Sequence, residues 1–461
     1  MRNLLYPGLY ALTLVIGLSC SKSGFLNTKP NASLVVPSSL SDFQALLDND
    51  IVMNGYGNGV VPSLGEIGAD NYYLLDANYN TSISALYRNC YTWQKQLYTG
   101  DEILDWDFPY RVAFYSNVVL TGLSGLSVTA AQQTQYNNEK GSALFFRSHA
   151  FYQLTQVFAP YYSINSNNDN APGIPLRLQA DINEPIRRAG LKTSYDQIFS
   201  DLQQALPLLP VTPLFKTRPS KTAAYALLAR AYLAIQDYSH AGLYADSSLQ
   251  LQSTLLDYNT LSPTATFAFA RFNAEVIFHA NLVGSITPIR PGLGKVDSSL
   301  FTSYNTNDLR RILFFKNISG GFTFVGSYDG SISLFGGLTT GEMYLVRAEC
   351  HARAGDAADA MQDLNHLLLT RWKTGTFIPL SAANAGDALR LVLTERRKEL
   401  PMRGLRWTDL RRLNTDPQFA TTLQRMVAGQ SSSLPPNDLR YVYPIPDNVI
   451  GFNPGMTQNP R

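Results

Sequence analysis

Charge is scarce in this sequence, which narrows the classes of partner that the protein can have. Asp, Glu, Lys and Arg make up only 16% of the 461 residues, and the formal net charge is +2. A charge so close to neutral creates no field that would attract nucleic acid or an acidic membrane surface. Hydrophobic residues reach 45%, which excludes a largely disordered chain and supplies material for a large core.

Metal-binding and catalytic signatures are also missing. The three cysteines form neither a CxxC pair nor a zinc-ligand spacing, and the five histidines do not pair as ligands. No HExxH, GxSxG or Walker-type glycine-rich loop occurs. Acidic residues gather between Asp101 and Asp107, as a glycosidase would need, but such a cluster is more typical of a helix N-terminus. We therefore expect no catalytic activity, no metal and no cofactor.

Only one long apolar run occurs, and it lies at the N-terminus. Residues 4–18 are almost free of polar side chains and follow the positive charge of Arg2. The run is too short to span a bilayer and has the proportions of a secretory signal. Small residues then lead to Cys20, as in a lipoprotein signal peptide. We predict a signal peptide over residues 1–19 and acylation of Cys20, with a simple cleaved signal as the alternative.

Helical periodicity organises much of the remaining chain. Two segments, at about 220–251 and 338–371, each contain a pair of short helices joined by a tight turn. Arg230-Ala231 in the first matches Arg347-Ala348 in the second, so each unit places an alanine where paired helices approach closely. The repeat predicts stacked hairpins of the tetratricopeptide (TPR) type, with an ordinary helical bundle as the alternative.

Three stretches have the composition of loops. Residues 53–82 are rich in Gly, Asn and Tyr, and residues 160–190 contain dense turn signals. Residues 255–340 hold short aromatic runs among Gly, Ser and Asn, which predicts loops with short strands. Since this last stretch separates the two hairpins, it is a long insertion on a rigid scaffold, and such insertions often carry function.

Three motifs mark the start, the C-terminal helices and the tail of the chain. They are Cys20 followed by Gly24-Phe25-Leu26-Asn27-Thr28-Lys29-Pro30; Glu395-Arg396-Arg397-Lys398-Glu399-Leu400 followed by Gly404, Arg406-Trp407, Asp409-Leu410 and Arg412; and Tyr443-Pro444-Ile445-Pro446 followed by Asn453-Pro454 and Gln458-Asn459-Pro460. Together they resemble the SusD/RagB family of nutrient-binding outer-membrane lipoproteins. The alternating charges of the second motif also have a structural interpretation, because Arg–carboxylate pairs fix one helix against another.

The resemblance implies a mainly α fold of TPR-type hairpins with long loop and short-strand insertions. It divides the chain into the signal peptide, an N-terminal region over 20–215 and a C-terminal region over 216–461. It further implies a lipid-anchored protein on the outer membrane, facing the cell surface. Its function would be non-catalytic capture of oligosaccharide and delivery to a SusC-like TonB-dependent transporter.

The glycan site is expected in the 70–79 loop, its neighbours and the insertion. Aromatic rings stack on the apolar faces of sugars, while amides, carboxylates and guanidinium groups bind hydroxyls. The candidate ligand-binding residues are Asp70, Asn71, Tyr72, Tyr73, Tyr79, Trp93, Arg310 and Tyr328. Two alternatives remain open: a SusD-like protein that binds peptide, and an adaptor that binds other proteins through its TPR groove.

Overall fold

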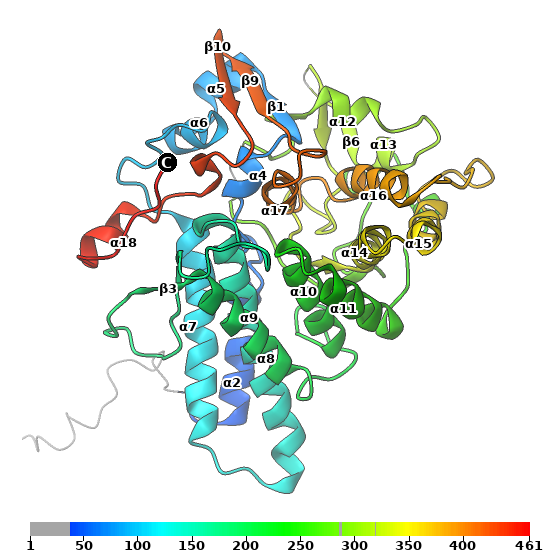
Figure 1. The fold of residues 1–461 in the computed structure, drawn as a ribbon. Helices are drawn as coiled ribbons and strands as arrows, with labels where there is room; N and C mark the ends of the chain where they lie inside the picture. Colours follow the sequence, from blue (N-terminus) through cyan, green and yellow to red (C-terminus); the bar gives the residue numbers. More distant parts are fainter. Residues whose placement is uncertain (1–36, 285–287, 319) are drawn as a thin grey trace, which may run out of the picture. The chain divides into compact units, whose positions relative to one another are not determined.

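Helices dominate the structure, as the periodicity of the sequence predicts (Figure 1). The computed structural model describes residues 37–284, 288–318 and 320–461. The predicted signal peptide 1–19 and the lipidation site Cys20 lie outside these residues. The chain divides into two units, 1–38 and 39–461, and the arrangement below is that of the second. Within the described residues no helix has the length and apolar character needed to cross a membrane.

The first part of the unit is built around long helices. α7 packs against α8 and α8 against α9, with α2 lying against both α7 and α8. The elements up to α9 are α2 (Leu40–Leu47), α3 (Asp50–Met53), α4 (Leu64–Gly68), β1 (Tyr72–Leu74), α5 (Asp76–Thr81), α6 (Ala85–Tyr91), α7 (Leu104–Ser124), η1 (Ala130–Gln132), α8 (Gln133–Phe158), β2 (Pro172–Pro175), β3 (Arg188–Gly190) and α9 (Leu191–Ala205). The predicted loops 53–82 and 160–190 therefore contain short helices and strands.

Both predicted hairpins are present, and they stack on each other. The first is α10 (Lys221–Ala234) with α11 (Tyr238–Leu251), and the second is α14 (Thr340–Arg353) with α15 (Ala357–Leu369). α11 packs directly against α14, so the second hairpin continues the first (Figure 1). The two helices approach closely where Gly242 of α11 faces Cys350 of α14. A Cβ at Gly242 would lie only 3.0 Å from the Cβ of Cys350. This contact gives Cys350 the core role expected of a small buried residue.

The insertion between the hairpins consists of loops and short strands, as predicted. Its elements are η2 (Tyr258–Thr260), β4 (Val276–Phe278), β5 (Gly294–Val296), α12 (Ser298–Thr302), α13 (Arg310–Leu313), β6 (Phe315–Asn317), β7 (Phe322–Phe324) and β8 (Leu338–Thr339). β4 pairs with β8, and β6 with β7, all antiparallel. β5 also belongs to the insertion, but it pairs with β1. This pairing connects the insertion to the N-terminal part of the unit.

The C-terminal part closes over the N-terminal helices. It comprises α16 (Ala385–Glu399), α17 (Arg406–Leu413), β9 (Leu423–Val427), β10 (Gln430–Leu434), η3 (Leu439–Tyr441) and α18 (Asp447–Phe452). The Tyr443 hydroxyl donates to the Leu64 carbonyl at 2.6 Å, and the Asn459 amide donates to the Phe158 carbonyl at 2.7 Å. The proline-rich tail thus docks along the body through hydrogen bonds to the ends of α4 and α8.

Candidate functional site

The pairing of β1 with β5 brings the predicted 70–79 segment against the insertion. Tyr72 lies opposite Val296, Tyr73 opposite Lys295 and Leu74 opposite Gly294. The Asp297 amide extends the ladder by donating to the Asn71 carbonyl at 2.9 Å. Because residues more than 200 positions apart share this ladder, the two segments form one surface.

Successive residues of β1 face opposite sides, so the two tyrosines of this strand differ in role. Tyr72 points inward and is only 3% exposed, with its hydroxyl donating to the Ile67 carbonyl at 3.0 Å. The Arg425 guanidinium lies among three rings, 3.6 Å from the centroid of Tyr91, 4.9 Å from Trp93 and 5.1 Å from Tyr72. These three rings form an aromatic box, and the Arg425 guanidinium lies inside it and makes cation–π contacts with them.

Trp93 belongs to the same interior box. Its side chain is 2% exposed, and its Nε1 donates to the Gly68 carbonyl at 2.9 Å. Neither Trp93 nor Tyr72 presents a ring face to solvent. Both side chains instead pack in the interior, on the buried side of β1.

Partly exposed residues of β1 and α5, together with two glycines of the insertion, form a face that we call the loop platform, made of Tyr73, Leu75, Asn78, Tyr79, Gly320 and Gly321. The Tyr79 ring also packs against Tyr91 of the aromatic box, with 6.0 Å between the ring centroids, so only part of this ring faces solvent. A Cβ at Gly321 would lie 3.4 Å from the Tyr73 hydroxyl oxygen, and one at Gly320 would lie 3.9 Å from Leu75 Cδ1. The Asn78 amide donates to the Leu293 carbonyl at 3.1 Å. The four side chains are partly exposed, so the platform offers two aromatic rings and an amide to solvent.

Asp70 and Asn71 lie behind the platform and connect it to the C-terminal motif. Arg406 binds the Asp70 carboxylate through two hydrogen bonds of 2.6 and 2.9 Å, and Arg397 lies 3.3 Å away. Burial raises the pKa of Asp70, but these two cations outweigh it and hold the pKa well below its usual range. Asn71 is buried and donates to Glu66 at 2.8 Å. Both residues serve structural contacts in this arrangement.

Arg310 is placed in the interior rather than on the platform. Its guanidinium is fully buried and binds Asp308 at 2.7 Å, Glu395 at 2.6 Å and Glu399 at 3.1 Å. We call these four residues the Arg310 cluster. A guanidinium surrounded by three carboxylates has no remaining face for a ligand. Its position in a loop-rich insertion predicts exposure, but no local pattern identifies these distant partners.

Tyr328 is buried next to the Arg310 cluster. Its hydroxyl donates to Glu275 at 2.9 Å and lies 2.7 Å from the Tyr258 hydroxyl. Glu275 in turn pairs with Arg371 at 2.8 Å, and Arg371 with Glu399 at 2.7 Å. Tyr328 is therefore one member of a buried polar network that links the insertion to α16, and it does not reach the platform.

Asp105, one of the acidic residues beside Trp106, has a structural role too. The Asp105 carboxylate accepts from the Leu64 amide at 2.9 Å, which satisfies the N-terminus of α4. Burial raises the pKa of Asp105 to about 6. The second family motif likewise forms internal pairs, since Arg396 binds Asp409 at 2.9 Å and Arg412 binds Glu349 at 2.8 Å. The structural interpretation of that motif is confirmed.

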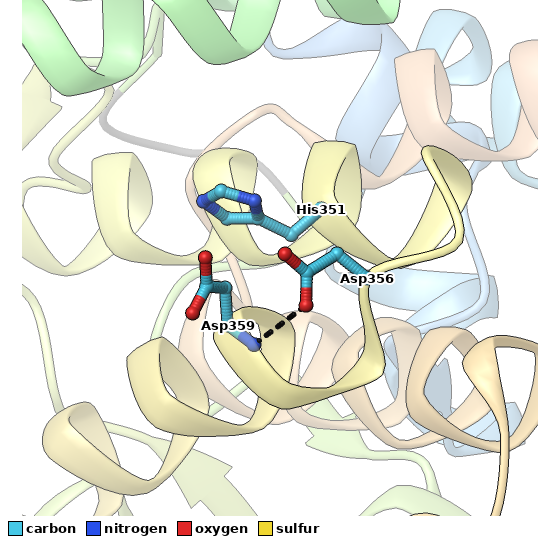
Figure 2. A group of neighbouring side chains, drawn as sticks. All are labelled: His351, Asp356 and Asp359. Carbon is cyan, nitrogen blue, oxygen red and sulfur yellow. Dashed lines mark hydrogen bonds between the residues drawn. The ribbon is translucent and has the colours of Figure 1, made fainter.

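His351, Asp356 and Asp359 lie close together at the turn of the second hairpin (Figure 2). One ligand-type atom from each residue lies within 4.8 Å of the others. The Asp356 carboxylate is already used, because it accepts from the Asp359 amide at 3.0 Å and caps α15. We attribute the cluster to helix capping, which places such carboxylates at a helix start.

The two hairpins also enclose a concave cavity of about 720 Å³ between α11, α14 and α15. Arg347 lies on its wall and pairs with Asp246 at 2.6 Å and Asp363 at 2.7 Å, so one guanidinium bridges both hairpins. Tyr238, Tyr344 and His366 also line it. We call this cavity the TPR groove. Unlike the loop platform, it is lined largely by polar residues, and its Arg347 and Asp side chains already pair with one another.

Comparison with known families gives two matches along the chain. Residues 24–233 match a family model described as starch-binding, associating with the outer membrane, and residues 340–461 match the model of the SusD family. Together these segments cover well over half of the chain. Among curated proteins, none matches the sequence significantly.

Solved structures share the fold at low sequence identity. A SusD superfamily protein from Bacteroides thetaiotaomicron is 20% identical, with a TM-score of 0.74 over 92% of this chain and 100% of that one. A SusD-like carbohydrate-binding protein from Bacteroides vulgatus is 19% identical, with a TM-score of 0.68 over 91% and 98%. A laminarin-binding SusD-like protein is 18% identical, with a TM-score of 0.64 over 91% and 97%.

Proposed function

Because this chain belongs to the SusD family, we propose that it captures oligosaccharide at the bacterial outer membrane. SusD family proteins are non-catalytic binding proteins, which agrees with the absence of catalytic motifs from the sequence. The family model over residues 24–233 is described as starch-binding, and one similar structure binds laminarin. Starch and laminarin are both glucose polymers with different linkages, so the supported ligand class is a glucan rather than one particular chain.

The observation that carries this proposal is the loop platform. Tyr73 and Tyr79 offer partly exposed rings, and Asn78 offers an amide beside them. A pyranose has apolar C–H faces that pack on aromatic rings and hydroxyls that bind amides. The platform is also held rigidly from behind by the aromatic box around Arg425, so little ordering is needed when a ligand binds.

Delivery of the ligand to a SusC-like TonB-dependent transporter completes the proposed role. The family description supports association with the outer membrane. The Cys20 motif supports a lipid anchor, and two or more acyl chains would hold the protein stably at the membrane. The TPR groove offers a polar concave surface on which a protein partner could dock, separate from the loop platform.

Calorimetry on the double variant Tyr73→Ala/Tyr79→Ala tests the binding site, with maltohexaose and laminarihexaose as ligands. We expect the variant to lose about 1–2 kcal/mol of binding free energy, which is about tenfold in Kd, for whichever glucan the protein binds. Tyr56→Ala is the matched control, because Tyr56 is exposed but lies outside the platform. Unchanged affinity in the double variant would discard this placement of the site.

A further inference from the structure

A stripe of aromatic residues on α7 lines a second cavity, away from the loop platform. Trp106, Tyr110 and Phe114 are spaced four residues apart, so their rings stand on one face of the helix in successive turns. Together with the 175–186 segment and α18, they enclose about 430 Å³. The Tyr110 hydroxyl donates to the Pro175 carbonyl at 2.8 Å, which holds the opposite wall in place. We call this cavity the α7 pocket.

Two charged side chains flank the aromatic stripe. Asp107 and Arg111 are one helical turn apart and both line the pocket. Within the described residues Arg111 forms no ion pair, and its buried Nε has no hydrogen-bond partner. Arg177, across the pocket, is by contrast engaged with the Asp181 carbonyl at 2.6 Å. The Arg111 guanidinium lies over the Phe108 ring, 4.4 Å from its centroid, and lines the pocket without a carboxylate partner among the described residues.

The mouth of the pocket is marked by exposed apolar side chains. Ile182 is 75% exposed and Phe452 is 85% exposed, and they come from different segments of the chain. Both also line a neighbouring cavity of about 860 Å³. Exposed apolar residues gathered at a cavity mouth are typical of binding sites, and both volumes lie within the range of ligand pockets.

We propose that the α7 pocket is a second carbohydrate subsite, which holds one pyranose ring of a glucan. The ring would stack on Tyr110 and Phe114, the partly exposed residues of the stripe, while one hydroxyl accepts from Arg111 and another donates to Asp107. The adjoining cavity would take the next sugar units. The ligand class rests on the proposed function, but the site does not depend on the loop platform.

The charges of the pocket favour a neutral ligand with hydroxyls over other occupants. An anion would meet the Asp107 carboxylate, and a cation would meet two guanidinium groups. A purely apolar ligand would remove water from the Asp107 carboxylate and the Arg111 guanidinium that line the pocket and would offer them no hydrogen bond, which carries a desolvation cost. A sugar ring avoids both penalties, because each hydroxyl can donate and accept.

Calorimetry with maltohexaose and laminarihexaose separates the two sites. The platform variant Tyr73→Ala/Tyr79→Ala should retain weaker binding, and adding Phe114→Ala should reduce that residual affinity by about tenfold or more. Arg111→Gln, which keeps the stripe intact, should also weaken it. Tyr115→Ala is the matched control, because Tyr115 lies on α7 outside the pocket lining. Thermal unfolding of each variant checks that the fold is kept.

Each outcome decides between the sites. Residual binding that Phe114→Ala and Arg111→Gln both leave unchanged would overturn the α7 pocket, as would a platform variant with no residual binding at millimolar ligand. Binding that depends on Phe114 but not on the platform would support the pocket and reject the platform. If neither glucan binds the native protein at millimolar concentration, both proposals fail.

Discussion

In the two stacked hairpins, small apolar residues make most of the helix contacts, beside the buried ion pair Arg230–Glu342, whereas clusters of several buried charges hold the insertion between them. Ala231 and Ala348 are fully buried at the hairpin contacts. Arg310 in the insertion and Arg371, at the end of the second hairpin segment, are equally buried, and each is surrounded by carboxylates. The scaffold is therefore stabilised mainly by packing, and the insertion, which carries Gly320 and Gly321 of the platform, is stabilised mainly by ion pairs.

The two kinds of contact have different consequences for the site. Apolar packing tolerates small shifts of one helix against another, while a bidentate ion pair fixes both distance and direction. The Arg310 cluster joins α13 to α16, and β6 directly follows α13. The position of the β6–β7 hairpin, and hence of Gly320 and Gly321 on the platform, thus depends on buried charges.

The largest expected effect is the loss of stability when Arg310 is replaced, which tests whether buried charges hold the insertion in place. Arg310→Met should lower the free energy of unfolding by about 3–5 kcal/mol, because it leaves buried carboxylates without their cation. Arg347→Met, in the scaffold, should cost about 1 kcal/mol or less, because Arg347 and its partner Asp246 are partly exposed. Urea unfolding of both variants measures the difference, provided that the m-values agree.

Equal losses of stability in the two variants would contradict this difference between the insertion and the scaffold. A loss near 1 kcal/mol for Arg310→Met would mean that packing, rather than charge, holds the insertion in place. A double variant Arg310→Met/Glu399→Gln provides the internal check, since removing a carboxylate together with the cation should recover part of the loss.

The same difference explains what could be predicted from the sequence. The hairpins follow from apolar periodicity within single helices, a local signal, so α10, α11, α14 and α15 appear where expected. The site depends on pairings between distant residues. Strand alternation predicts that Tyr72 and Tyr73 face opposite sides, but only the pairing with β5 decides which ring faces out.

Arg310 shows most clearly which contacts cannot be predicted from the sequence. A guanidinium in a loop-rich segment looks the same in sequence whether it is free or paired, and its partners Glu395 and Glu399 lie more than 80 residues away. The stripe Trp106, Tyr110 and Phe114, in contrast, follows the helical period of α7. Its significance depended on the walls that the 175–186 segment and α18 supply, which no local pattern reveals.

Two buried glutamates, one in the scaffold and one behind the platform, differ in their electrostatic surroundings. Burial raises the pKa of Glu349, but Arg412 outweighs it and lowers the pKa below its usual value. At Glu66 burial outweighs the hydrogen bonds from Asn71 and Gly404 and raises the pKa from 4.5 to about 7. Folded Glu66 therefore keeps a proton that the unfolded chain has released, so this residue makes stability fall as pH rises from about 4.5 to 7.

Glu66→Gln should remove that part of the pH dependence. The difference in unfolding free energy between variant and native protein should change by about 3 kcal/mol across this window, in favour of the variant at the higher pH. Chemical unfolding at a series of pH values measures it, with Glu102→Gln as the control at an exposed position. A difference that stays constant with pH would show that Glu66 is ionised throughout.

The smallest expected effect lies in the scaffold, at the turn shown in Figure 2. Asp356→Ala removes the N-cap of α15 and should lower the melting temperature by a few degrees at most. Asp237→Ala is the matched change, because Asp237 caps α11 in the first hairpin by accepting from the His240 amide at 3.1 Å. If capping is the whole role of Asp356, both variants lose the same amount, and adding zinc or calcium changes neither. A melting temperature that rises with metal in the native protein, but not in Asp356→Ala, would instead make the turn of the second hairpin an ion site and separate the two hairpins in function.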